Sequence, residues 1–181
     1  MLNRAVGGAY GYTTDIGGYE DLYTGPTSKE LLLRWAEWAA LSPFFRLHNS
    51  GSTGTQMPWD FDQETIDDYR MLSQLHQRAA PLILSLWQEA QSDGLPPTRP
   101  LWLAYPNDPV AAQQDQEWLL GPDVLVAPVV TEGATTQQVY LPTGCWTYQP
   151  DGSQRAGGAT VTVAAPLGTL PYFFHCGTTP F

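Results

Sequence analysis

The sequence changes character near residue 122, and this change limits the folds open to the chain. Before it, short apolar runs alternate with longer stretches of helical periodicity. After it, short apolar runs are separated by Gly, Pro or Asp, namely DVLVAPVV, QQVYLP, CWTYQ, ATVTVAAP and LPYFFH. Alternating strands and helices form parallel sheets, whereas closely spaced short strands form antiparallel sheets. We therefore expect an α/β domain over residues 1–121 and a small all-β domain over residues 122–181.

The α/β part opens with one predicted βαβ unit. Residues 8–16 have no helical period and end before two glycines, which predicts a strand that enters a tight turn. A capping box at residues 27–30 (TSKE) begins a helix predicted over residues 28–41, and Pro43 stops it. Residues 44–48 (FFRLH) predict a second strand. This order is typical of a parallel sheet.

The remaining α/β segments are too few to close a barrel. Residues 50–54 (SGSTG) predict a loop, and residues 62–93 predict a long helix that Pro81 kinks or divides. A third strand is predicted over residues 99–105 and a short helix over residues 109–120. Three βα units cannot close an eight-stranded barrel, and an open parallel sheet of three strands leaves apolar faces and edges exposed. We therefore expect the chain to be part of a larger structure.

Polar side chains follow the two predicted strands of the βαβ unit. Asp15 ends the first strand. Arg46 and His48 lie two residues apart on the second, so both should point to one face. An ion pair between Asp15 and Arg46 is expected there. Two other interpretations stay open at this point, because Asp15 can serve as a turn cap and His48 can be a buried core histidine.

The sequence does not predict a metal site. His48, His76 and His175 fall on unlike elements. Cys145 and Cys176 are too few for a disulfide framework and lack the spacing of zinc ligands. We predict two free thiols in a reducing compartment.

Charge and hydropathy limit the classes of partner. The net charge is −10, from 18 acidic against 8 basic residues. Nucleic acids and anionic membranes are bound by basic patches that displace counterions, so neither is an expected partner. The first residues lack the pattern of a secretory leader, and no apolar stretch is long enough to span a membrane. We therefore expect a cytoplasmic protein.

Several segments together resemble the C-terminal half of glycoside hydrolase family 31, which includes α-glucosidases, α-xylosidases and sulfoquinovosidases. They occur in the family's order and cover nearly the whole chain. They are residues 14–19 (TDIGGY), 30–35 (ELLLRW), 42–49 (SPFFRLHN), 99–101 (RPL) and 121–129 (GPDVLVAPV).

The resemblance implies the C-terminal part of a (β/α)8 TIM barrel, about strands six to eight, followed by a small antiparallel β-sandwich. Asp15 would end strand six, His48 would end strand seven, and Tyr105 would lie near the end of strand eight. Residues 122–181 would form the family's proximal C-terminal sandwich.

The resemblance also implies a chemistry. The family hydrolyses α-glycosidic bonds with retention, using an aspartate nucleophile and an aspartate acid/base. By the resemblance, both aspartates would belong to segments upstream of Met1, and neither motif is found in residues 1–181. No catalytic residue, metal or cofactor is therefore expected here.

The expected contribution of this chain is to sugar binding. Asp15, Tyr19, Arg46 and His48 would line the −1 subsite for an α-glycoside or oligosaccharide, and His48 would hydrogen-bond hydroxyls of the sugar. Tyr19 matches a position where sulfoquinovosidase-like members carry a Tyr that helps hold the sulfonate and several α-glucosidases carry Phe. Two alternatives remain: a non-catalytic carbohydrate-binding or scaffold remnant, and a barrel completed by a separately encoded N-terminal half.

Overall fold

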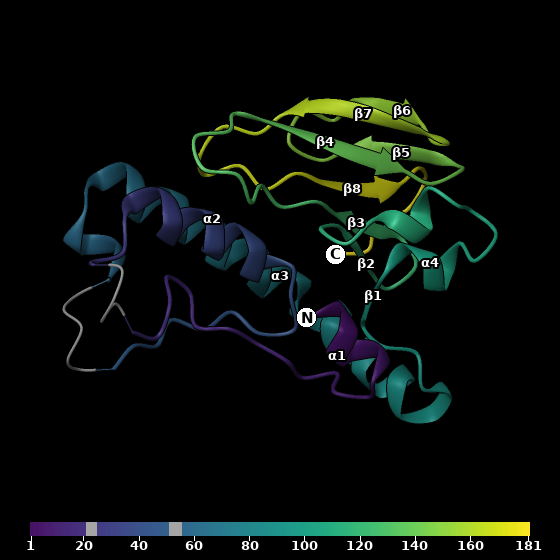
Figure 1. The fold of residues 1–181 in the computed structure, drawn as a ribbon, viewed down its shortest axis with the longest axis horizontal. Coiled ribbons are helices and arrows are strands. Elements are labelled where there is room, and N and C mark those ends of the chain that lie inside the picture. Colours follow the sequence, from purple (N-terminus) through teal and green to yellow (C-terminus); the bar gives the residue numbers. More distant parts are fainter. Residues whose placement is uncertain (21–24, 51–55) are drawn as a thin grey trace.

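Two helices lie side by side against an antiparallel β part (Figure 1). The structure is a computed structural model that describes residues 1–20, 25–50 and 56–181. The loop predicted at residues 50–54 lies outside the described residues except for residue 50. The helices are α1 (Leu2–Val6), α2 (Lys29–Ala40), α3 (Gln63–Asp93) and α4 (Leu101–Ala104), with 3-10 turns η1 (Pro58–Asp60) and η2 (Ala111–Gln113).

Helix α2 confirms the helix predicted over residues 28–41, but its cap differs from the predicted one. The N-cap is Ser28, whose hydroxyl accepts a hydrogen bond from the Leu31 amide at 3.1 Å. Thr27 instead donates to the Gly17 carbonyl at 2.8 Å, and Glu30 accepts from the Gly133 amide at 2.6 Å. The two residues of the predicted capping box thus hold neighbouring segments rather than the helix end.

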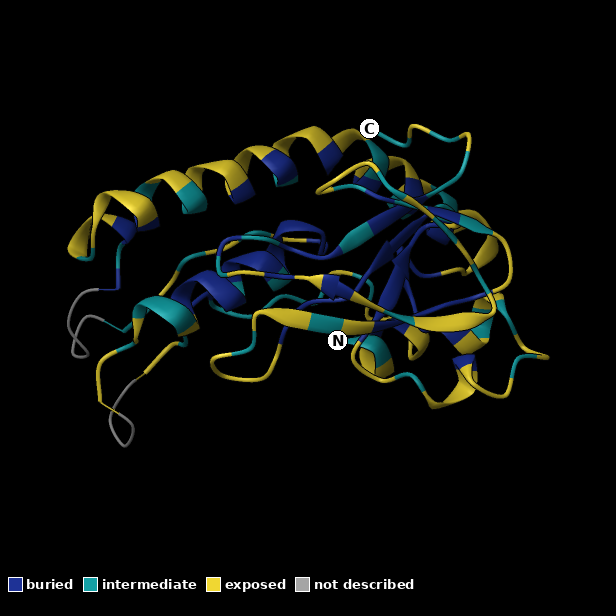
Figure 2. Cartoon of the chain, turned by 90° about the horizontal axis from the view of Figure 1, so that it is seen from above, coloured by how far each residue is buried: buried dark blue, intermediate teal, exposed yellow. Residues whose placement is uncertain are grey.

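Helix α3 begins at the predicted N-cap Asp62, which accepts a hydrogen bond from the Thr65 amide, and ends before Gly94 at a positive φ of 78°. It runs for 31 residues without division at Pro81. Pro81 lies on the exposed face, where water can solvate the carbonyl that loses its helical partner. Figure 2 shows this exposed outer face and the buried residues opposite it. No helix among the described residues is long and apolar enough to cross a membrane.

The predicted parallel strands are not present as strands. Residues 8–16 and 44–48 are extended or turn-like, and the Ile16 amide donates one hydrogen bond to the Arg46 carbonyl at 2.9 Å. Parallel ladders are stable when both faces are covered and neighbouring strands flank them, and the described part of the chain places no strand beside either segment. The two segments therefore lie together without forming a ladder.

Two further predictions for residues before 122 gave the wrong type of secondary structure. Of the strand predicted over residues 99–105, only Arg99 is in a strand, β1 (Thr98–Arg99), because Pro100 has no amide to donate to a ladder and is the N-cap of α4. The helix predicted over residues 109–120 is η2 followed by β2 (Trp118–Leu120). The division of the chain at residue 121 stays a prediction.

The β part is antiparallel, as predicted. One sheet has six strands in the order β1-β2-β3-β8-β5-β6, and a two-stranded sheet pairs β4 with β7. The strands not yet given bounds are β3 (Val124–Val126), β4 (Thr136–Leu141), β5 (Cys145–Tyr148), β6 (Gln154–Ala156), β7 (Ala159–Ala164) and β8 (Tyr172–His175).

One hydrophobic core joins the helices to the larger sheet. Leu32 of α2 and Leu86 of α3 belong to the same buried cluster as Trp118, Val124 and Phe174. A second cluster contains Trp146 and Phe173 of the larger sheet together with Leu101 of α4 and Ala111 of η2. The burial of α2 against both α3 and the β part fixes the helix in place.

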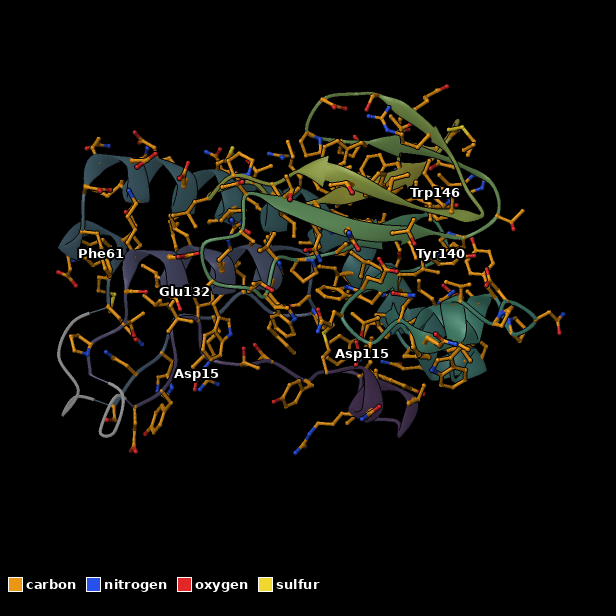
Figure 3. The ribbon with its side chains drawn as sticks, turned by 45° about the horizontal axis from the view of Figure 1, so that its top comes forward. Asp15, Phe61, Asp115, Glu132, Tyr140 and Trp146 are labelled. Atoms are coloured by element: carbon orange, nitrogen blue, oxygen red, sulfur yellow. A yellow bond between two sulfur atoms is a disulfide. The ribbon has the colours of Figure 1, made fainter. Side chains whose placement is uncertain are left out.

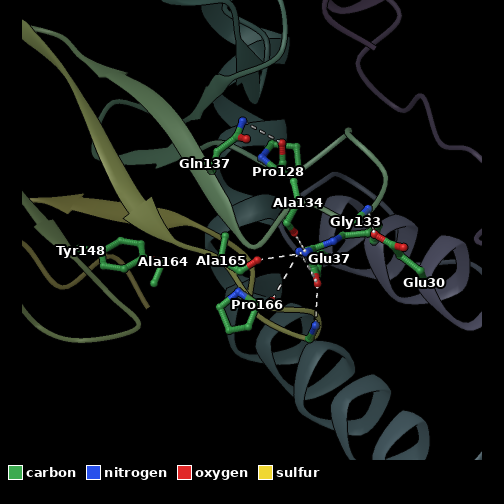
Figure 4. Close-up of polar contacts among 12 residues, drawn as sticks. Glu30, Glu37, Pro128, Gly133, Ala134, Gln137, Tyr148, Ala164, Ala165 and Pro166 are labelled. Atoms are coloured by element: carbon green, nitrogen blue, oxygen red, sulfur yellow. Dashed lines mark hydrogen bonds and ion pairs between the residues drawn. The ribbon is translucent and has the colours of Figure 1, made fainter.

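A buried ion pair adds a polar link between α2 and the loops of the β part (Figure 4). Arg34 donates to Glu37 at 2.9 Å and to the carbonyls of Ala134 at 2.6 Å and Ala165 at 3.0 Å. Glu37 also accepts from the Gly168 amide at 2.8 Å. Burial raises the pKa of Glu37 to about 7, while Arg34 acts in the opposite direction.

Cys145 and Cys176 form a disulfide, which corrects the prediction of two free thiols. The register of β5 and β8 pairs Trp146 with His175, so the flanking cysteines face each other with Cα atoms 5.3 Å apart. This pairing follows from strand register, which the spacing of the cysteines does not reveal. The expectation of a reducing compartment was based on two free thiols. Because the cysteines form a disulfide, that basis is lost.

We predict that the double substitution Cys145→Ser and Cys176→Ser lowers the free energy of unfolding by about 2–4 kcal/mol, because the disulfide restricts the unfolded chain. Urea unfolding followed by tryptophan fluorescence measures this change. A reductant should lower the stability of the wild type and leave the variant unchanged. Two reactive thiols in the unreduced wild type would contradict the disulfide.

Glu117 is a buried carboxyl without a cationic partner among the described residues. It is 4 % exposed, and one oxygen accepts from the Tyr140 amide at 3.2 Å while the other has no hydrogen-bond partner. Burial raises the pKa of Glu117 to about 8, and the Tyr140 hydrogen bond acts in the opposite direction. The folded state therefore holds this proton more tightly than the unfolded state does.

We predict that the stability contributed by Glu117 is complete below pH 4.5, the ordinary pKa of the group, and is lost as the pH rises to about 8. The loss is on the order of 4 kcal/mol. Unfolding free energies measured across this range should fall less steeply for Glu117→Gln than for the wild type. The exposed control Glu20→Gln should keep the wild-type slope, and parallel curves for Glu117→Gln and wild type would refute the prediction.

Candidate sugar-binding site

The structure brings the four predicted site residues together at the ends of the two extended segments. Arg46 Nε lies 2.8 Å from Asp15 Oδ1, which is the expected ion pair. Arg46 Nη2 lies 2.8 Å from His48 Nδ1. The Tyr19 ring packs against His48 with centroids 5.2 Å apart. Figure 3 places Asp15 beside the extended segments, well away from Tyr140 and Trp146 of the β part.

Alternation along residues 45–48 sets which side chains face the site. Phe45 and Leu47 pack against the core shared by the helices and the sheet. Arg46 and His48 point the other way and remain 48 % and 50 % exposed. The two side chains share a face as predicted, although the segment forms no ladder, and His48 is not a core histidine.

A tight turn at Gly17 and Gly18 positions Asp15 and Tyr19. Both glycines have positive φ, at 82° and 94°, and the Gly18 amide donates to the Asp15 carbonyl at 2.9 Å. A side chain at residue 17 would crowd Gln56 Oε1 and Leu32, which lie 3.1 and 3.2 Å from the position of a Cβ. Glycine is therefore required here for both conformation and space.

Gln56 and Thr27 hold this turn, and no pattern in the sequence marks either residue for this role. Gln56 Nε2 donates to the Gly18 carbonyl at 2.7 Å, and the Thr27 hydroxyl lies within hydrogen-bond distance of both Gly17 O and Gln56 Oε1. Gln56 is only 6 % exposed, which is unusual for this residue type. The feature that marks Gln56 is its burial in the folded chain, and patterns in a single sequence do not show such burial.

A cavity of about 510 Å³ lies next to the site. Thr14, which precedes Asp15, lines it and accepts a hydrogen bond from Trp35 Nε1. The rest of its wall consists mainly of α2 side chains, including Trp38, and of residues 129–132. The wall is largely apolar, whereas the four site residues form a polar group beside it.

The described residues contain no group of three or more His, Cys, Asp or Glu side chains that could hold a metal ion. His76 Nδ1 lies 3.1 Å from the Ala40 carbonyl, and His175 packs against Trp146. These contacts of His76 and His175 do not involve His48.

The arrangement suits recognition of hydroxyl groups. Asp15 provides acceptor oxygens, Arg46 provides donors, and Tyr19 and His48 provide aromatic surface with polar edges. Retaining glycoside hydrolysis requires two carboxyl groups about 5–5.5 Å apart. Asp15 is the one carboxylate among the four residues and is already engaged by Arg46. These residues can bind a polyhydroxylated ligand, but they do not by themselves supply both reacting groups.

Comparison with known proteins gives a consistent result. A model described as the glycosyl hydrolases family 31 TIM-barrel domain matches residues 1–86, and one described as the glycosyl hydrolase family 31 C-terminal domain matches residues 94–179. A sulfoquinovosidase of Agrobacterium fabrum is 35 % identical over 97 % of this chain and 26 % of its own length. Alpha-glucosidase 2 of Bacillus thermoamyloliquefaciens is 32 % identical over 98 % of this chain and 22 % of its own length.

A solved structure shares the fold. The family 31 α-xylosidase from a soil metagenome, complexed with xylose, superposes with a TM-score of 0.90 at 28 % identity, over 99 % of this chain and 29 % of that one. The chain spans about a quarter of the length of the curated relatives it matches.

Proposed function

Because this chain belongs to glycoside hydrolase family 31, we propose that it is a C-terminal portion of a retaining α-glycosidase and supplies part of the −1 subsite. In this proposal residues 1–121 correspond to about strands six to eight of the barrel, and residues 122–181 to the proximal C-terminal sandwich. Asp15, Tyr19, Arg46 and His48 contact the sugar and carry out no bond cleavage.

The single observation that carries the proposal is the hydrogen-bonded group formed by Asp15, Arg46 and His48. Three polar side chains from two segments converge with contacts of 2.8 Å, yet all remain accessible. A structural ion pair would gain little from such an exposed position, since exposed pairs contribute about 0–1 kcal/mol. Pre-positioned donors and acceptors facing solvent suit a ligand that carries many hydroxyl groups.

The proposal places the nucleophile and the acid/base in another segment of the enzyme. Asp15 is the one carboxylate among the four site residues and pairs with Arg46, whereas the reaction needs two carboxyl groups, so the proposal takes both from elsewhere. The part supplied here fixes the orientation of the sugar ring, and such positioning lowers the entropic barrier for reacting groups that lie opposite it.

We predict that the 181-residue chain alone does not hydrolyse aryl α-glucoside, α-xyloside or α-sulfoquinovoside, because Asp15 is the one carboxylate among the four site residues and retaining hydrolysis needs two. Release of the aryl alcohol measures turnover. The decisive variants are Asp15→Asn and the surface control Asp67→Asn. Turnover by the wild type that only Asp15→Asn abolishes would show that Asp15 is a reacting carboxylate and would refute the proposal.

The sugar accepted is proposed to be a sulfonated one, and Tyr19 carries this part of the proposal. Tyr19 is 47 % exposed and packs against His48, so its hydroxyl can reach a ligand held there. The sulfoquinovosidase and the α-glucosidase match the chain at similar identity, so overall similarity does not decide between them.

We predict that Tyr19→Phe weakens binding of methyl α-sulfoquinovoside by about tenfold, the effect of one hydrogen bond to a charged group. Binding of methyl α-glucoside should change little. NMR titration of the wild type and the variant measures both affinities, with Tyr12→Phe as the control. Equal losses for the two sugars would contradict a role in sulfonate recognition.

The alternative is a non-catalytic carbohydrate-binding or scaffold protein derived from such an enzyme. The shared core of helices and sheet favours it, because it gives the chain the means to fold as one unit. Sugar binding together with a single cooperative melt would support it. Co-expression with the N-terminal half of a family 31 enzyme distinguishes the two, since restored hydrolysis indicates an enzyme portion.

A further inference from the structure

Arg46 uses two nitrogens to hold two different groups. Its Nε lies 2.8 Å from Asp15 Oδ1, and its Nη2 lies 2.8 Å from His48 Nδ1. A guanidinium carries only hydrogen-bond donors. His48 Nδ1 must therefore be the acceptor in this contact and carries no proton. The ring proton of His48 then resides on Nε2.

We infer that Arg46 is a positioning residue that sets the tautomer of His48 and so makes His48 a hydrogen-bond donor to the ligand. The Nε2–H form follows from the contact itself, whereas the role toward a ligand rests on the proposed sugar-binding function. Asp15 presents acceptor oxygens on the same face. Together they form a matched acceptor and donor for sugar hydroxyls, which both donate and accept.

The nearby carboxylate of Asp15 is the reason why the tautomer of His48 depends on Arg46. Its Oδ1 lies 3.7 Å from His48 Nδ1, so without Arg46 it is an available acceptor for a proton on that nitrogen. A ring protonated at Nδ1 would turn Nε2 into an acceptor. Asp15 and His48 would then both present acceptors, and a hydroxyl could donate to only one of them. Arg46 prevents this by occupying Nδ1.

His76 provides an internal contrast within the same chain. Its Nδ1 lies 3.1 Å from the Ala40 carbonyl, and a carbonyl oxygen can only accept. His76 is therefore the Nδ1–H tautomer, opposite to that of His48. Burial lowers the pKa of His76, with the Ala40 hydrogen bond acting in the opposite direction, so this ring is neutral at mildly alkaline pH.

Long-range ¹H–¹⁵N correlation spectra of the ¹⁵N-labelled 181-residue chain test the inference directly. They are recorded at about pH 8, above the ordinary histidine pKa. The variants His48→Gln and His76→Gln assign the ring signals. The expected result is the Nε2–H pattern for His48 and the Nδ1–H pattern for His76. A Nδ1–H pattern or an even mixture at His48 in the wild type overturns the inference.

The role of Arg46 is tested by Arg46→Ala. The expected result is loss of the pure Nε2–H pattern at His48, with a shift toward Nδ1–H as Asp15 becomes the acceptor. His76 should keep its pattern, which shows that the variant is folded. The control Arg70→Ala removes an exposed arginine paired with Asp67 and should leave both rings unchanged. An unchanged His48 in Arg46→Ala would refute the positioning role.

Titration with methyl α-glucoside and methyl α-sulfoquinovoside separates this inference from the proposed function. If the wild type binds either sugar, Arg46→Ala should lose the shifts that the sugar causes at His48. Retained binding by Arg46→Ala with a changed tautomer would overturn the link between tautomer and recognition. If the wild type binds neither sugar, the proposed function fails, while the tautomer pattern still decides whether Arg46 controls His48.

Discussion

The buried pair of Arg34 and Glu37 is the contact on which the arrangement of the two parts depends. Their side chains are 9 % and 0 % exposed, so each ion has lost most of its hydration. Carbonyls of Ala134 and Ala165 and the amide of Gly168 replace that water. Removing one partner of such a pair typically costs about 3–5 kcal/mol, because the other is left buried and uncompensated. The pair therefore permits few positions of α2 relative to the β part.

The position of α2 in turn determines the candidate site. Thr27, just before the helix, donates to the turn at Gly17, and Leu32 of the helix packs close to the same glycine. Helix α2 thus supports the candidate site and is itself fixed to the β part. This explains how Asp15 and Arg46 keep a defined geometry although their segments form no ladder and are joined by isolated backbone hydrogen bonds, from Ile16 to Arg46 and from Ser50 to Tyr19.

Local patterns predicted the parts of the fold that depend on neighbouring residues. Helical periodicity located α2 and α3, the cap at Asp62 located the start of α3, and alternation placed Arg46 and His48 on one face. The errors concern partners distant in sequence. The parallel strands lack flanking strands, the pairing of Cys145 depends on the register of β5 and β8, and the burial of Gln56 depends on a turn 38 residues away. None of these partners leaves a signal in the local sequence.

The geometry also explains why binding and bond cleavage would be divided between segments. A carboxylate held by a guanidinium is well placed to accept hydrogen bonds, but the oxygen that Arg46 binds is not free to attack a sugar carbon. In the proposed function Asp15 therefore serves as a hydrogen-bonding wall of the sugar site, and the reacting carboxyls come from other segments. The same guanidinium contacts His48, so one side chain touches both of the groups proposed to bind the ligand. In the proposed arrangement, other segments supply the reacting carboxyls, so this wall has no proton to transfer and can stay rigid.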